Sequence, residues 1–129
     1  MTALPANHAK DFQASLYAIE DNGKTIFYGT DTAHLTEEVW RAFDQEKMRF
    51  DLVVLDHTYG PKEEERDHLN ASRLVEHGER MRKEGILKKE GSLLATHIAH
   101  EGNPIHPQLV KFASLNGYEV AYDGLSMKI

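Results

Sequence analysis

Residues 51–55 read DLVVL, and this short stretch decides the fold class. The four residues after Asp51 are apolar without a break, which is typical of a strand buried on both faces. Residues 92–97 (SLLATH) repeat the pattern further along the chain. We therefore predict that both stretches are buried strands of one sheet.

Two further strands are predicted ahead of this central run. Residues 14–20 (ASLYAIE) and 25–29 (TIFYG) are both strand-like. Between them stands Asp21-Asn22-Gly23-Lys24, a sequence typical of a tight hairpin turn. The pattern predicts an antiparallel hairpin at one edge of the sheet.

Three helices are predicted where apolar residues recur at helical spacing. The first begins after Thr36, the second covers about residues 70–84, and the third opens at His106-Pro107. Between the first two, residues 60–68 (GPKEEERDH) read as a charged, solvated loop. The alternation of strands and helices predicts an α/β sandwich with parallel crossovers. Two short strands, within residues 118–124 and 125–129, are predicted to close the chain.

Composition excludes several classes of protein. The chain has 129 residues, no repeat and no linker, so we expect residues 1–129 to form a single unit. A net charge of −6 argues against a nucleic-acid surface, and no apolar run is long enough to span a membrane. The absence of cysteine excludes disulfides and thiolate metal sites and favours a cytoplasmic location. The eight histidines require another explanation. Among them, we expect His77 to lie on the surface of its helix and His57 to lie in the loop after residues 51–55, near the rim of the sheet.

Four ionisable residues are predicted to meet at one edge of the sheet. Asp31, Asp56 and His97 each come at or just after the end of a predicted strand. Ligands of α/β sheets collect outside the carboxyl ends of the strands. The hairpin returns the chain to its starting edge, which should bring His8 close to Asp31. Histidine and carboxylate without cysteine suit zinc, manganese or iron, although each residue alone could equally cap a strand or a loop.

Six short segments, in order, resemble the second half of a metallo-β-lactamase-fold hydrolase. They are ALPANHA at 3–9, FYGTDT at 27–32, LVVLDHTYG at 52–60, HLN at 68–70, THIAH at 96–100 and AYDG at 121–124. The branch that they resemble most contains the phosphodiesterases that open phosphoribosyl cyclic phosphates as accessory proteins of carbon–phosphorus lyase. The resemblance covers almost the whole chain.

The resemblance assigns a metal ligand to each of three positions. His8 resembles the terminal ligand of a first divalent ion, and His97 the terminal ligand of a second. Asp31 resembles the carboxylate that bridges the two ions, zinc or manganese. It is therefore counted among the catalytic residues as well as the ligands.

Three other residues take roles beside the metals by the same resemblance. His68, in HLN, resembles a catalytic histidine that faces the phosphate without binding metal. Asp56 resembles an acid behind the ligands that orients one of them or a loop. His100 follows His97 by three positions and faces the substrate or, equally, bonds only to its own loop.

The family's defining motif, His-x-His-x-Asp-His, is not in the chain. That motif supplies ligands to both metals and lies upstream of the segments quoted above. We therefore expect residues 1–129 to be the C-terminal half of such a domain. Alone, the chain would offer two protein ligands per metal and be inactive.

The resemblance implies a hydrolase that opens a small cyclic phosphodiester with metal-activated water. Two alternatives remain: a non-catalytic α/β module that oligomerises through its sheet, and a nuclease similar to ribonuclease Z. A metallo-β-lactamase fold packs two αββα halves face to face, so one half alone leaves a sheet face uncovered. We therefore expect a homodimer, or a complex with the missing N-terminal half.

Overall fold

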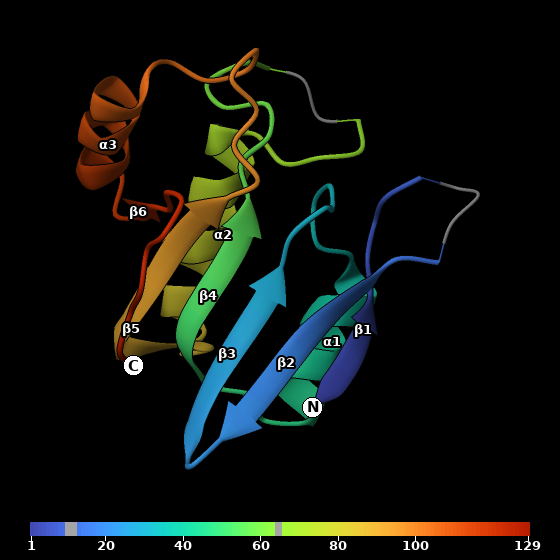
Figure 1. The fold of residues 1–129 in the computed structure, drawn as a ribbon. Coiled ribbons are helices and arrows are strands. Elements are labelled where there is room, and N and C mark those ends of the chain that lie inside the picture. The colour runs from blue at the N-terminus through green and yellow to red at the C-terminus, as the bar shows by residue number, and fades with distance from the viewer. Residues whose placement is uncertain (10–12, 64–65) are drawn as a thin grey trace.

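The computed structural model describes residues 1–9, 13–63 and 66–129. Six strands form one sheet in the order in which they occur along the chain (Figure 1). The antiparallel part contains β1 (Thr2–Pro5), β2 (Ser15–Asp21) and the start of β3 (Lys24–Gly29). From β3 onward the pairs are parallel and continue through β4 (Phe50–Asp56), β5 (Leu87–Thr96) and β6 (Glu119–Val120). The predicted α/β class is confirmed.

The ends of the sheet differ from the prediction. β1 was not expected, and it pairs with β2 as a short edge strand ending at a proline. β5 begins at Leu87 rather than at residue 92, because Leu87 pairs with Phe50 of β4 and the residues up to Ser92 form an irregularity before regular pairing resumes. Residues 125–129 form no strand. The charged loop contains residues 64 and 65, which lie outside the described part of the chain.

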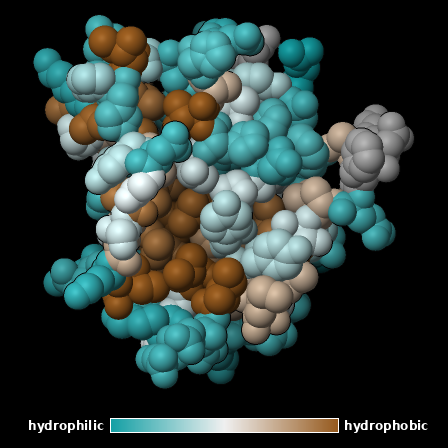
Figure 2. All heavy atoms as spheres, in the orientation of Figure 1, coloured by the Kyte–Doolittle hydropathy of each residue, from teal (hydrophilic) through white to brown (hydrophobic). Residues whose placement is uncertain are grey.

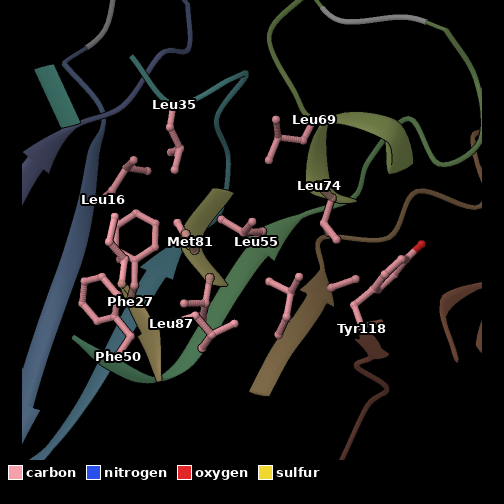
Figure 3. Packing of buried hydrophobic residues seen from close by; sticks show 14 of the residues in the cluster. Leu16, Phe27, Leu35, Phe50, Leu55, Leu69, Leu74, Met81, Leu87 and Tyr118 are labelled. Carbon is pink, nitrogen blue, oxygen red and sulfur yellow. The ribbon is translucent and has the colours of Figure 1, made fainter. Parts of the chain in front are cut away.

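Helices α1 (Glu37–Gln45) and α2 (Ala71–Lys83) cover one face of the sheet (Figure 1). The core lies between them and the strands, and Figure 3 shows its buried side chains. Phe27, Phe43 and Phe50 form an aromatic cluster there, with ring centroids 5.0–5.4 Å apart. α3 (His106–Leu115) lies at the β6 end and buries Leu109 and Ala113. None of the helices in the described residues is long and apolar enough to cross a membrane.

The start of α2 follows the prediction, but one of its histidines does not. Asn70 is the N-cap, and its side chain accepts a hydrogen bond from the Arg73 amide at 2.9 Å. His77 was expected on the surface, but it is buried and accepts a hydrogen bond from the Leu35 amide at 3.1 Å. This long-range partner is invisible in the sequence. Burial lowers the pKa of His77 to about 4.

The opposite face of the sheet is only partly covered. Leu52, Val54 and Leu94 form a second apolar cluster, and the C-terminal segment packs on it through residues 121, 125 and 127. Figure 2 shows apolar side chains at the centre of this face. On the hairpin the large side chains that stay 37–45% exposed are Tyr17, Ile19 and Tyr28. The chain therefore covers part of the face that was expected to be bare.

Candidate metal centre

Three of the predicted site residues meet at the carboxyl edge of the parallel strands. Asp31 lies two residues beyond β3, Asp56 ends β4, and His97 directly follows β5. Because β3, β4 and β5 are parallel, their carboxyl ends share one edge, the upper one in Figure 1. Asp31 and His97 both have left-handed backbones, each with φ of 57°. Such a conformation costs a non-glycine residue about 1–2 kcal/mol.

One carboxylate oxygen lies at the centre of this cluster. Asp31 Oδ1 is 3.5 Å from His8 Nε2, 3.6 Å from His68 Nδ1 and 4.0 Å from His97 Nε2. These separations exceed those of hydrogen bonds, which place the heavy atoms about 2.7–3.2 Å apart. The antiparallel hairpin has brought His8 beside Asp31, as its geometry predicts. The imidazoles therefore surround the carboxylate without bonding to it.

The ring of His8 is held from behind by the loop before α2. Its Nδ1 lies 3.0 Å from the carbonyl oxygen of Asp67, which can only accept a hydrogen bond. The proton is therefore on Nδ1, and the lone pair of Nε2 points toward Asp31. The Asp67 carboxyl accepts a hydrogen bond from the Tyr59 hydroxyl, which lowers its pKa. The sequence prediction missed Tyr59 and Asp67, although Tyr59 stands in the quoted segment 52–60.

Asp56 is a fully buried carboxylate with a complete set of partners. Its Oδ1 accepts hydrogen bonds from the amide and the hydroxyl of Thr58, at 2.8 and 2.7 Å. Its Oδ2 accepts a hydrogen bond from His68 Nδ1 at 2.9 Å. A buried charge is tolerable when it is paired and hydrogen-bonded in this way. Asp56 therefore fixes the His68 ring and leaves its Nε2 free.

Thr58 connects the same carboxylate to His97. Because the Thr58 hydroxyl donates its proton to Asp56, it can accept one from His97 Nδ1, which lies 2.7 Å away. His97 then has an unprotonated Nε2 on the side of Asp31. Thr58 was not predicted to belong to the site, although it too lies within segment 52–60.

The donor set fits a divalent ion. His8 and His97 each present an Nε2 lone pair, and the tautomer of each is set by an acceptor behind the ring, as in protein metal sites. Ligand atoms on one tetrahedral zinc ion, at about 2.0–2.1 Å from the metal, lie about 3.4 Å apart. The 3.5 Å between His8 Nε2 and Asp31 Oδ1 is close to that spacing. Two overlapping groups can hold metal: Asp31, Asp56, His68 and His97, and His8, Asp67 and His68.

The other predicted histidines lie outside this cluster. His100 is exposed on the loop after β5 and lines a cavity of about 250 Å³ with His106, Ile105 and neighbouring residues. Its role toward a substrate stays a prediction. His57, expected in a loop near the rim, is fully buried beneath the site instead.

Comparison with known proteins identifies a family for the sequence and a related fold for the structure. The family model described as "Beta-lactamase superfamily domain" matches residues 1–98. The fold superimposes on a metallo-beta-lactamase fold protein from Bacillus subtilis, YhfI, with a TM-score of 0.66 and 21% sequence identity. That match covers 96% of this chain and 47% of the other, so the chain spans about half the length of that structure. No curated protein matches the sequence.

At 21% identity, the structural likeness establishes the fold alone. The family match, which extends over about three quarters of the chain, establishes more. It includes Asp31, Asp56, His68 and His97, together with the hairpin that carries His8 to them. The chain belongs to the beta-lactamase superfamily.

Proposed function

We propose that this chain forms half of the active site of a metal-dependent phosphodiesterase that opens a small cyclic phosphate. His8 and His97 would be the terminal ligands of two divalent ions, zinc or manganese, and Asp31 would be shared between them. The observation that carries the proposal is the convergence of the His8 and His97 Nε2 atoms on one carboxylate oxygen, at 3.5 and 4.0 Å.

Phosphodiester hydrolysis requires an activated water, neutralised phosphate charge and a proton for the leaving oxygen. Bound divalent ions supply the first two, since they lower the pKa of water and attract phosphate oxygens. Asp31 suits a shared position because its Oδ1 lies between the Nε2 atoms of His8 and His97. His8 and His97 suit the terminal positions because neutral imidazole binds without adding charge.

His68 is the residue placed to move a proton. Its Nδ1 donates to the buried Asp56 carboxylate at 2.9 Å, which leaves Nε2 as the atom that faces away from the sheet edge. A proton held at Nε2 would pass to the leaving alkoxide, and Asp56 would stabilise the charged ring before transfer. General acid catalysis of this kind contributes about 10²–10⁴-fold to rate.

The remaining metal ligands must come from other residues. Each ion would have one histidine and a share of Asp31, whereas catalytic zinc sites use three protein ligands. A protein about twice as long would supply them, in keeping with the 47% coverage of the Bacillus structure. We therefore propose that the 129-residue chain alone hydrolyses no phosphodiester and that the domain's other half restores activity.

The test compares variants of a protein that contains this chain together with the other half of the domain. Asp31→Ala should remove both bound metal and hydrolysis of a cyclic or aryl phosphodiester. His68→Ala should lower kcat by at least 100-fold while metal content stays unchanged. His106→Ala, an exposed histidine outside the cluster, is the matched control and should change neither.

Three results would contradict the proposal. Rapid metal-dependent hydrolysis by the 129-residue chain alone would show that its own ligands suffice. Loss of metal in the His68→Ala variant would make His68 a ligand rather than the acid. If neither the 129-residue chain nor the protein with both halves of the domain binds metal, the chain is better explained as a non-catalytic module.

A further inference from the structure

His57 lies between Asp56 and Thr58 in the sequence, but its side chain takes no part in the candidate metal centre. Its side chain is fully buried, and both ring nitrogens have partners. Nδ1 lies 2.8 Å from Asn103 Oδ1, and Nε2 lies 2.8 Å from the hydroxyl of Tyr118. The amide oxygen only accepts, so Nδ1 donates to it and Nε2 accepts the tyrosine proton. Burial lowers the pKa of His57 and raises that of Tyr118 to about 12, which keeps both neutral.

Asn103 joins the two loops that carry the site. Its Nδ2 donates to the carbonyl oxygens of His57 and Thr58, both at 3.1 Å, and to that of Ala99 at 2.9 Å. The loop after β4 is thus tied to the loop after β5. The backbones touch here, because a Cβ placed on Gly60 would lie 2.5 Å from the carbonyl oxygen of residue 102. Neither loop can shift without the other.

Tyr118 connects His57 and Asn103 to the sheet. It is buried immediately before β6, the strand that pairs with β5, so its hydroxyl has a fixed position. The backbone amide of His57 also bonds to the Thr96 carbonyl at 2.9 Å, next to His97. The hydrogen bonds of the His57 imidazole therefore reach the residue before β6 and the loop after β5, and its backbone amide reaches the end of β5.

We propose that His57 is a positioning residue that, through Tyr118 and Asn103, holds Thr58 against His97 and so keeps Nε2 of His97 unprotonated. The residues on either side of His57 hold the two rings, since Asp56 bonds His68 and Thr58 bonds His97. A small rotation of this loop would separate the Thr58 hydroxyl from His97 Nδ1. The inference deepens the proposed function, on which it rests for the identity of His97 as a ligand.

The experiment uses the ¹⁵N-labelled 129-residue chain and the variant Tyr118→Phe, which removes one buried oxygen and keeps the ring. Long-range ¹H–¹⁵N correlation spectra of the metal-free chain report which nitrogen of His97 carries the proton. Titration with zinc reports affinity separately. Tyr122→Phe, an exposed tyrosine that contacts His106, is the matched control.

In the unmodified chain and in Tyr122→Phe, His97 should carry its proton on Nδ1 alone. In Tyr118→Phe the spectra should show both tautomers, and zinc should bind about tenfold more weakly, the lower end of effects of groups behind a ligand. The His57→Asn variant keeps a donor within reach of Asn103 but loses the hydrogen bond to Tyr118. It should therefore show the same His97 tautomers and zinc affinity as Tyr118→Phe. The double variant should be no weaker than either single one, because both break the same link.

A purely structural role makes a different prediction. Variants that unfold at lower urea concentration but keep the His97 tautomer, and zinc affinity within twofold of the unmodified chain, would overturn the proposal. Should the protein that contains both halves of the domain bind no zinc, the proposed function fails, while the His97 tautomer of the metal-free chain still decides the role of His57.

Discussion

Replacing Asp56 with asparagine gives the sharpest test of the site, because it exchanges one oxygen for an NH₂ group without changing the volume. Asp56 accepts three hydrogen bonds while fully buried. In Asp56→Asn the amide oxygen can still accept from Thr58. The NH₂ group then faces His68 Nδ1, where two donors meet. His68 must move its proton to Nε2 or lose the contact.

The expected magnitude follows from the bond that is lost. A hydrogen bond to a charged group contributes about 1.5–3 kcal/mol, and no cavity adds to this cost. We therefore expect the free energy of unfolding to fall by about 2 kcal/mol. In the protein that contains both halves of the domain, kcat should also fall, since no carboxylate would stabilise the charged His68 ring that donates its proton from Nε2.

Urea unfolding measures the stability, and ¹H–¹⁵N correlation spectra identify the protonated nitrogen of His68. Asp44→Asn makes the same chemical change at an exposed site on α1 and should leave both quantities unaltered. A variant in which His68 keeps its proton on Nδ1, with unfolding unchanged, would refute the reasoning. Asp56 would then not be the group that orients His68.

Three further predictions concern stability and assembly. His77 has a pKa of about 4 in the folded chain, against an ordinary value of 6.5. The free energy of unfolding is therefore highest above pH 6.5 and falls by about 3 kcal/mol as the pH falls to about 4. Urea unfolding of His77→Gln should lack that loss. The Lys88 ammonium lowers the pKa of Asp51 to about 2, so Asp51 contributes stability above pH 3.8 that disappears toward pH 2. An Asp51→Asn variant that unfolds in acid at the same pH as the unmodified chain, followed by circular dichroism, would contradict this. The exposed Tyr17, Ile19 and Tyr28 predict a dimer at micromolar concentration, and sedimentation of Ile19→Lys should show a monomer; an unmodified chain that sediments as a monomer would count against the interface.

Local signals predicted most of the fold. The Asn22-Gly23 turn was readable because both residues take positive φ, 49° and 77°, which these residue types tolerate. β4 was readable because an unbroken apolar run has few alternatives. β1 and the start of β5 were missed, since β1 is a strand through its pairing with β2 and Leu87 joins β4 only across an irregularity in the register.

The candidate site divides in the same way. His8, Asp31 and His97 could be placed together from topology alone, because strand ends and a hairpin determine where the backbone goes. Thr58 and Asn103 could not, since their importance comes from side-chain hydrogen bonds between residues 39–46 positions apart. His77 was misplaced for a related reason: its partner, the Leu35 amide, is 42 residues away.

The backbone at the rim supports a functional interpretation on independent grounds. Asp31 and His97 occupy left-handed conformations that glycine would adopt at lower cost, and five glycines of this chain do take positive φ. Replacing either by glycine would relieve about 1 kcal/mol of strain each. The chain instead has an acid and an imidazole there, with ligand atoms 4.0 Å apart and without a hydrogen bond between them. Asn22 and Lys47 also have positive φ, but they lie in turns away from this edge. A shared metal ion, as proposed above, would give Asp31 and His97 a common function that the strain alone does not supply.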